Sequence, residues 1–238
     1  MPELSLRWGI DGVEDALANG DNVVIVDVLR FSSAVVAATA RGFTIEPSAD
    51  KYRKKESGAR LSPGYYENRV PGRVQIYSSN GAFLSIAAAV AENVFVGSLL
   101  NAKAVARHVD GLRHSASLIA AGEIDGERLP MMGDYETDMA DGNRIFCMED
   151  MLGAGAVARF SRMAKSSECV QAERLFRLFE AKLGAALEQS ATGRFNESRG
   201  NGGDTQLCSE LNRYDVVPSV HIADGVVEIS AARITGKR

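Results

Sequence analysis

Long hydrophobic runs are missing from this sequence. Even the most apolar stretches, such as residues 85–91, are far shorter than the roughly 20 residues that a membrane-spanning helix needs. No basic segment followed by an apolar one opens the chain, so we expect neither a secretion signal nor a membrane partner. The sequence therefore predicts a cytoplasmic protein.

Cysteine and histidine are scarce. The three cysteines form an odd set without a CxxC spacing, which is typical of free thiols in a reducing cytoplasm. The three histidines are widely spaced along the chain, so we expect no histidine-based metal cluster. The chain has no strong excess of positive or negative residues: its net charge is only −4, and this charge is spread over the whole chain. We therefore expect no nucleic-acid partner.

Several signatures of nucleotide- and phosphate-processing enzymes are also absent. No GxxxxGK[ST] loop occurs, which excludes a P-loop enzyme. Leu29 stands where the DxD motif of a haloacid-dehalogenase-type enzyme needs its second acid, and no cysteine has the arginine six positions later that a cysteine phosphatase needs. Residues 153–158 spell G-x-G-x-x-A, but they lie inside a helical pattern rather than after a strand. We interpret these small residues as a site of close helix packing.

Strand and helix patterns alternate along the chain. A continuous apolar run at 22–28 predicts a strand buried on both faces, and alanine-rich residues 34–40 predict the helix that follows. We expect further strands at 44–47, 73–77, 93–96 and 117–121, helices at 82–91, 102–109, 151–160, 168–189 and 204–212, and a closing hairpin around 223–225. The alternation predicts an α/β fold, layered α/β/α, with a mixed, largely parallel sheet.

Three expectations concern the organisation of the chain. The predicted helix at 168–189 carries one apolar stripe, formed by residues 175, 178, 179, 183, 186 and 187, that should be buried. Residues 125–147 are polar and predict an extended surface loop. A strand, a Ser/Asn-rich turn and an Ala-rich helix occur at least twice, which suggests an internal duplication. We expect one domain over residues 1–238, with subdomains of about 1–120 and 121–238 if the duplication is real.

Polar side chains follow the predicted strands. In open α/β sheets, ligands bind beyond the carboxyl ends of the strands, and free amides at helix starts favour anions. The polar residues at these ends are Asp27, Arg30, Ser32, Ser33, Ser78, Ser79, Asn80, Ser98, Asn101 and Glu123. Hydroxyls, an amide and a guanidinium around helix starts suit a phosphate group, so we expect a small anionic phosphorylated substrate there.

Acidic residues near this edge suggest a metal ion. Asp27 is the acid in an otherwise apolar strand, and its carboxylate suits Mg²⁺, which prefers hard oxygen ligands. The alternative is that Asp27 caps the next helix or pairs with Arg30. Glu149 and Asp150 lie in the first turn of a predicted helix, where the helix dipole alone favours acids. Asn101 has the plain alternative of a helix N-cap.

These blocks, in this order, resemble the 2-phosphosulfolactate phosphatase family. The matching segments lie at 24–33, 79–81, 96–102, 121–123, 149–156, 198–204 and 217–218, so the resemblance covers most of the chain between residues 22 and 228. The segment before Glu149 is longer than is usual for the family. It also lacks the short basic stretch, with Arg before Pro, that often precedes the acidic pair; Arg144 is a candidate substitute.

The resemblance implies magnesium-dependent hydrolysis of 2-phosphosulfolactate to sulfolactate and phosphate on an α/β fold. It implies that Asp27, Glu149 and Asp150 are catalytic and hold Mg²⁺, and that Arg30 is catalytic. Candidates for substrate binding are Ser32, Ser33, Ser79, Asn80, Asn101, Glu123 and Arg199. Two alternatives stay open, a phosphatase for a different small phospho-acid and a non-catalytic anion-binding protein. A homodimer is the default expectation for a small cytoplasmic enzyme.

Overall fold

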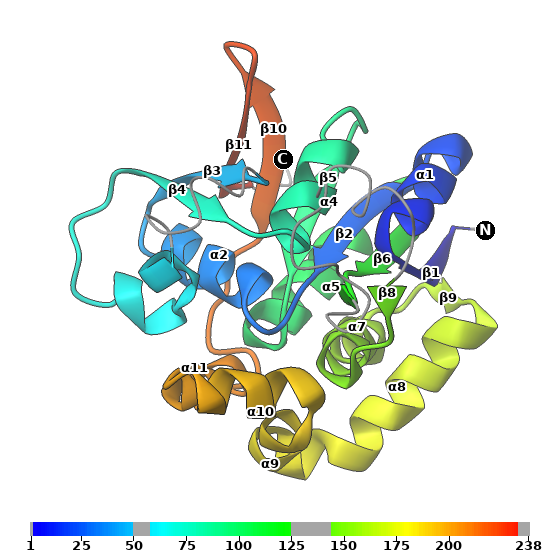
Figure 1. Ribbon diagram of the computed structural model, residues 1–238. Coiled ribbons are helices and arrows are strands. Elements are labelled where there is room, and N and C mark those ends of the chain that lie inside the picture. The colour runs from blue at the N-terminus through cyan, green and yellow to red at the C-terminus, as the bar shows by residue number, and fades with distance from the viewer. Residues whose placement is uncertain (1, 50–57, 125–143, 233–238) are drawn as a thin grey trace.

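A nine-stranded sheet forms the centre of the protein. The computed structural model describes residues 2–49, 58–124 and 144–232 (Figure 1). The strands are β1 (Glu3–Trp8), β2 (Asn22–Val26), β3 (Thr44–Ser48), β4 (Arg73–Tyr77), β5 (Val94–Gly97), β6 (Ala116–Ala120), β9 (Ala164–Lys165), β10 (Pro218–Ala223) and β11 (Val226–Ala231). Their order in the sheet is β4-β3-β11-β10-β5-β2-β6-β1-β9, and β7 (Glu123–Ile124) pairs with β8 (Arg144–Ile145) in a separate ribbon.

The sheet is mixed and largely parallel, which confirms the predicted fold class. The pairs β1–β6, β1–β9, β2–β5, β2–β6 and β3–β4 are parallel. The β10–β11 hairpin lies between β5 and β3 with antiparallel pairing on every side. Its turn projects away from the rest of the fold (Figure 1). The predicted internal duplication stays a prediction.

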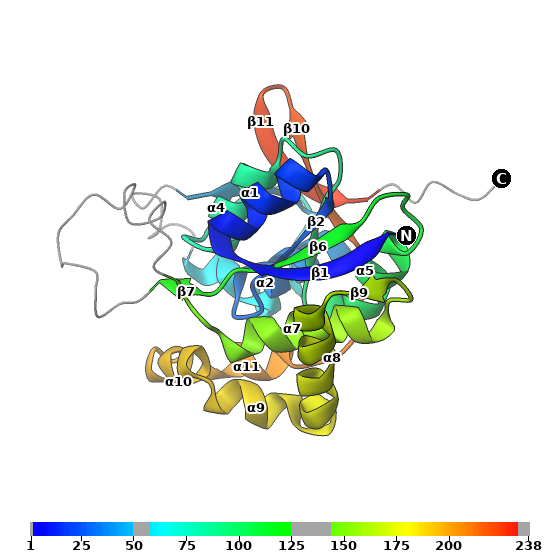
Figure 2. The ribbon, with the colours of Figure 1, turned by 90° about the vertical axis from the view of Figure 1, so that its right-hand side faces the viewer.

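Helices cover both faces of the sheet. The α-helices are α1 (Gly9–Asn19), α2 (Phe31–Ala40), α4 (Gly81–Ala88), α5 (Ala102–Val109), α7 (Met148–Phe160), α8 (Ser167–Phe179), α9 (Leu183–Gln189), α10 (Ala191–Ser198) and α11 (Gly202–Cys208). In the described residues, short 3₁₀ helices lie at Gly58–Leu61, Pro63–Tyr66, Leu99–Asn101 and Glu180–Lys182. Figure 2 shows α1 on one side of β1, with α7 and α8 on the other.

The alternation of side chains along β2 explains the core. Val23 and Ile25 pack into the core formed with α1, α2 and α4, whereas Val24 and Val26 pack into the core formed with α5, α7 and α8. All five residues of β2 are buried. A strand covered by helices on both faces must be apolar on both faces, which is why the sequence shows a continuous apolar run here.

Close packing of α7 confirms the interpretation of its small residues. A Cβ on Gly155 would lie 2.1 Å from the Ala172 carbonyl oxygen of α8, and one on Gly153 would lie 2.5 Å from the Val28 side chain. Real Cβ atoms do not approach this closely, so glycine lets α7 lie directly against α8 and the end of β2. The G-x-G-x-x-A pattern therefore serves packing.

The predicted long helix at 168–189 is wrong as a single helix. The chain forms α8, a 3₁₀ turn and α9, and the buried residues of α8 are Cys169, Ala172 and Phe176. Leu178 belongs to the predicted stripe but is 74% exposed. It follows the buried Phe176 by two residues, and residues two apart in an α-helix point to nearly opposite sides. Within the described residues, no helix combines the length and apolarity that a membrane span requires.

Candidate active site

Asp27 lies directly after β2, where two helices begin. Its Oδ1 accepts a hydrogen bond from the Phe31 amide at the start of α2 (3.2 Å). Its Oδ2 accepts from the Gly81 amide at the start of α4 (2.8 Å) and from the Ser78 hydroxyl (3.4 Å). Asp27 is 6% exposed. The carboxylate thus stabilises both helix starts, which carry partial positive charge. Its bond to the Phe31 amide agrees with the alternative that Asp27 caps the helix after β2.

Gly81 lets α4 approach this carboxylate. A Cβ at position 81 would lie 2.3 Å from the Phe31 ring and 2.8 Å from Asp27 Oδ2. Any side chain would therefore push the start of α4 away from Asp27. Strand β4 lies at the far edge of the sheet. Ser78, directly after β4, nevertheless contacts Asp27 at the end of β2.

Asp150 brings the start of α7 to the same place. Its Oδ1 accepts a hydrogen bond from the Val28 amide (2.8 Å), and its Oδ2 accepts from the Gly122 amide (2.9 Å). Val28 follows Asp27 directly, and Gly122 follows β6 with a φ of 66° that favours glycine. Asp150 therefore joins the ends of two neighbouring strands to α7.

Two glutamates complete a carboxylate cluster, which we define as Asp27, Glu123, Glu149 and Asp150. Glu123 Oε1 accepts a hydrogen bond from the Asn80 side-chain amide (2.9 Å). Glu149 is 3% exposed, and in the described part of the chain its carboxylate has no hydrogen-bond donor. The acids predicted to converge from β2 and from α7 therefore do converge.

Burial and mutual repulsion disfavour the charged forms of these acids. Burial, together with the charges of Glu123 and Glu149, raises the pKa of Asp27 from 3.8 to about 6, although hydrogen bonds from the Gly81 and Phe31 amides oppose the shift. Burial, followed by the charges of Asp27 and Glu149, raises the pKa of Asp150 well above its ordinary value. Negative charge in the cluster is thus incompletely compensated by the protein.

The cluster does not form a complete metal cage. Across residues 2–49, 58–124 and 144–232, no three or more His, Cys, Asp or Glu side chains are arranged so that they could hold one metal ion. Mg²⁺ usually takes only one or two carboxylates and fills its remaining positions with water and substrate phosphate. The donor set therefore suits a Mg²⁺ ion that shares its coordination with a ligand.

Arg30 is held by an acid that the sequence analysis did not select. The Arg30 guanidinium forms an ion pair with Asp204 in the first turn of α11, and both side chains are largely buried. Asp204 Oδ1 also accepts a hydrogen bond from the Ser62 hydroxyl at 2.5 Å. Arg30 is the N-cap residue of α2 and follows Asp27 by three positions, so both residues lie at the carboxyl end of β2.

The comparisons with known proteins agree with this geometry. A family model described as 2-phosphosulpholactate phosphatase matches residues 54–222 of the chain. The chain belongs to the 2-phosphosulfolactate phosphatase family. It is 27% identical to the "Probable 2-phosphosulfolactate phosphatase" of Carboxydothermus hydrogenoformans, over 89% of this chain and 91% of the relative. It is 26% identical to the protein of the same name from Symbiobacterium thermophilum, over 84% and 91%.

A third member of the 2-phosphosulfolactate phosphatase family extends this agreement. The protein from Caldanaerobacter subterraneus subsp. tengcongensis, again named "Probable 2-phosphosulfolactate phosphatase", is 23% identical over 92% of this chain and 95% of the relative. The family match at 54–222 includes three acids of the carboxylate cluster and Asp204. Asp27 and Arg30 precede the matched residues, so the family match does not bear on the roles predicted for them.

Three polar residues predicted to bind substrate support the strand ends in this family member. The Ser32 hydroxyl accepts from the Asp27 amide, and the Ser33 hydroxyl donates to the Val28 carbonyl. The Asn101 side chain accepts from the Ser98 amide and donates to the Val96 and Val216 carbonyls. All three side chains are fully buried. These bonds give them a structural role, and substrate contact by them stays a prediction.

Asn101 also differs from its predicted capping role. It precedes α5, but its side chain makes no capping bond to that helix and instead bonds back to Ser98 in a reciprocal capping box. Ser79 is half-buried, and its hydroxyl has no hydrogen-bond partner in the described part of the chain. Arg199 is exposed, with its guanidinium 5.1 Å from the centre of the Phe195 ring. Substrate contact by Arg199 stays a prediction.

Asp204 and Ser62 are the site residues that sequence reasoning missed. Asp204 lies at the start of a helix after a Gly-rich stretch, where the helix dipole alone favours an acid. Its pairing with Arg30 joins residues 174 positions apart, which no local pattern reports. The predicted loop at 125–147 lies largely outside the described residues, as does the Arg144 side chain.

Proposed function

We propose that this protein is a magnesium-dependent phosphatase for a small phosphorylated acid. The observation that carries the proposal is the convergence of Asp27 with Glu149 and Asp150 at the end of β2, on the side where Arg30 lies. The names of three relatives support 2-phosphosulfolactate as the substrate, with sulfolactate and inorganic phosphate as products.

The carboxylate cluster supplies the Mg²⁺ site of this proposal. Asp27 together with Glu149 or Asp150 would hold the ion, and Glu149 has a carboxylate with no hydrogen-bond donor in the described part of the chain. A bound Mg²⁺ supplies Lewis-acid polarisation of a phosphate oxygen and relieves the repulsion among the acids. The raised pKa of Asp27, to about 6, supports a need for added positive charge.

Arg30 supplies the fixed positive charge for the phosphate group. Asp204, itself held by a hydrogen bond from the Ser62 hydroxyl, fixes the Arg30 guanidinium, so little conformational freedom is lost when an anion binds. The Ser79 hydroxyl, which has no partner in the described part of the chain, is available to donate to a phosphate oxygen. Such prearranged donors stabilise the charge that develops on the transferred phosphoryl group.

Water is the attacking group in this proposal. Both oxygens of Asp27 accept hydrogen bonds from the backbone, which fixes the carboxylate as a ligand and lowers its reactivity as a nucleophile. Turnover of a substrate with an isotopically chiral phosphoryl group should invert the configuration at phosphorus, because a single displacement by water inverts it. Retention of configuration would show that an aspartyl-phosphate forms, because two successive displacements restore the original configuration.

Phosphate release from a panel of small phospho-acids tests the function. We expect release from 2-phosphosulfolactate with Mg²⁺ and none with EDTA. The Asp27→Asn variant should lose at least about 100-fold in rate, whereas Asp15→Asn, which changes an exposed acid of α1, should retain full activity. Release from another phospho-acid alone would change the substrate, and no release from any would indicate an anion-binding protein.

Location and assembly complete the proposal. Three free, buried thiols support the cytoplasm as the working compartment. The β10–β11 hairpin exposes Ile222 (55%) and Val226 (41%), which supports self-association into a homodimer. Light scattering after size exclusion should give twice the chain mass of 25.5 kDa, and the chain mass itself would contradict the dimer.

A further inference from the structure

A hollow at the edge of the sheet has a charge opposite to that of the molecule. It measures about 530 Å³ and is lined in part by Arg60, Tyr65, Asn68, Arg69, Arg73 and Gln75. We name it the arginine pocket. Among the described residues that line it are three arginines and no acidic residue, in a chain whose net charge is −4. Concentrated positive charge in a concave site favours anions.

Two of the three guanidinium groups are free to bind a ligand. Arg73 forms an ion pair with Glu228. Arg60 and Arg69 form no ion pair with a carboxylate in the described part of the chain. Volume and charge together fit a small molecule with more than one anionic group.

Local contacts hold these two arginines in position. Arg60 donates from Nη1 to the Gln75 carbonyl oxygen of β4 (3.1 Å). The Arg69 guanidinium carbon lies 3.9 Å from the centre of the Tyr65 ring, a stacked arrangement that leaves its N–H edge available. A guanidinium held in this way binds phosphate or carboxylate oxygens with directed hydrogen bonds.

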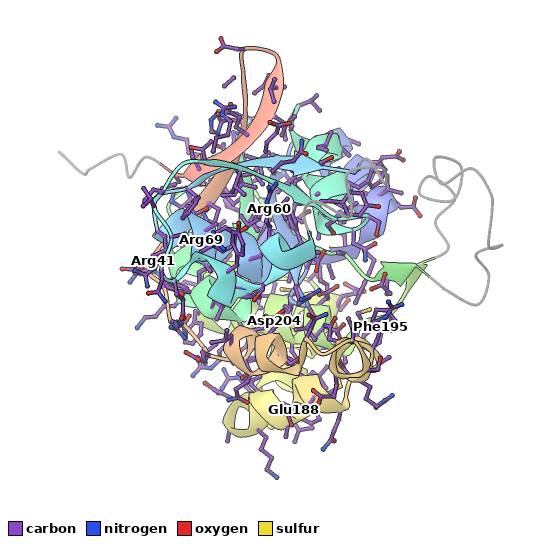
Figure 3. The ribbon with its side chains drawn as sticks, turned by 60° about the vertical axis from the view of Figure 1, so that its left-hand side comes forward. Arg41, Arg60, Arg69, Glu188, Phe195 and Asp204 are labelled. Atoms are coloured by element: carbon purple, nitrogen blue, oxygen red, sulfur yellow. The ribbon has the colours of Figure 1, made fainter. Side chains whose placement is uncertain are left out.

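The arginine pocket is separate from the carboxylate cluster. The two sites share no residue, and the pocket lies along β4, an edge strand of the sheet. In Figure 3, Arg60 and Arg69 lie above Asp204, the partner of Arg30, and Arg41 lies beyond Arg69 on the same side. A ligand in this pocket would therefore be distinct from a substrate at the end of β2.

We propose that the arginine pocket is a second binding site, for a small polyanion that carries phosphate or carboxylate groups. Arg60 and Arg69 provide the charge, and the Asn68 side chain provides a neutral polar group among the lining residues. The site requires neither the metal ion nor the turnover of the proposed phosphatase. It can be tested whether or not that function holds.

Calorimetric titration with inorganic pyrophosphate, in EDTA and low salt, tests the second site. We expect one binding event that weakens about tenfold in Arg69→Gln, because a hydrogen bond to a charged group contributes about that much affinity. Arg69 is exposed and its side chain packs on Tyr65, so the variant should fold normally. The matched control is Arg113→Gln, an exposed arginine before β6 that does not line the pocket.

Three outcomes would overturn the second site. Absence of pyrophosphate binding to the unmodified protein would do so, as would equal affinities of the Arg69→Gln and Arg113→Gln variants. Loss of binding in Arg30→Gln with full binding in Arg69→Gln would place the anion beside Arg30, at the proposed phosphatase site. That last result leaves the proposed phosphatase intact, so failure of the pocket and failure of the function are distinguishable.

Discussion

At the scale of single residues, Asp27 has two tasks. It accepts amide hydrogen bonds from the starts of α2 and α4, and it faces other carboxylates whose charge opposes its own. Helix capping alone would not place an acid among other acids. A buried acid with a perturbed pKa beside like charges is a common feature of functional sites, and this combination separates Asp27 from an ordinary cap.

The raised pKa of Asp27 predicts a pH dependence of stability in the absence of metal. Burial, together with the charges of Glu123 and Glu149, raises this pKa from 3.8 to about 6. Between these values the folded protein binds more protons than the unfolded chain, so the free energy of unfolding falls as pH rises from about 4 to about 6. The contribution is on the order of 3 kcal/mol. Urea unfolding in EDTA across this range checks it.

Two comparisons show whether Asp27 causes that decrease. Asp27→Asn should reduce the slope, because an amide does not titrate, and Mg²⁺ should restore stability near neutral pH by binding the charged cluster. The exposed Asp15 gives the control, since Asp15→Asn should keep the slope of the unmodified protein. Stability that rises with pH over the same range would contradict the buried, repelling arrangement.

At the scale of secondary-structure elements, glycine sets how closely α4 reaches the end of β2. Gly81→Ala places a Cβ 2.3 Å from the Phe31 ring, and the helix must move. We expect a loss of about 1–3 kcal/mol in stability together with reduced phosphate release. Gly203→Ala in α11 is the control, because a Cβ added at position 203 would meet no other atom within 4 Å. Equal unfolding midpoints and rates for both variants would refute the close approach.

The helix α11 contributes through Asp204. Asp204→Asn leaves the largely buried Arg30 without its charge partner, so we expect a loss of about 3 kcal/mol in stability and about tenfold in kcat/KM. Asp215→Asn removes the acid of an exposed pair with Arg107 and should cost less than about 1 kcal/mol. Thermal unfolding and steady-state kinetics measure both effects, and similar losses for the two variants would argue against a positioning role.

At the scale of the whole molecule, the sequence predicted the elements better than their arrangement. Strand β4 was expected at its observed bounds, because its turn signals and polar end are local. Strand β1 and helix α1 were missed, since β1 alternates polar and apolar residues with half-buried positions and lacks a buried apolar run. The insertion of the β10–β11 hairpin between β5 and β3 depends on long-range pairing that no local pattern encodes.

The candidate site shows the same division. Asp27, Glu149 and Asp150 were selected from strand-end position and family resemblance, and they converge. Ser32, Ser33 and Asn101 satisfied the same rule of position, yet their hydrogen bonds turn inward. A sequence shows that a polar side chain follows a strand. It does not show whether that side chain faces the ligand or the backbone of its neighbours.

The most direct test is a crystal structure of the protein with Mn²⁺ and sulfate. Mn²⁺ takes the oxygen ligands that suit Mg²⁺ and gives an anomalous signal that locates it. We predict a metal peak bound by Asp27 and by Glu149 or Asp150, with sulfate within reach of Arg30. A metal bound elsewhere, with those carboxylates in contact only with backbone amides, would contradict the account.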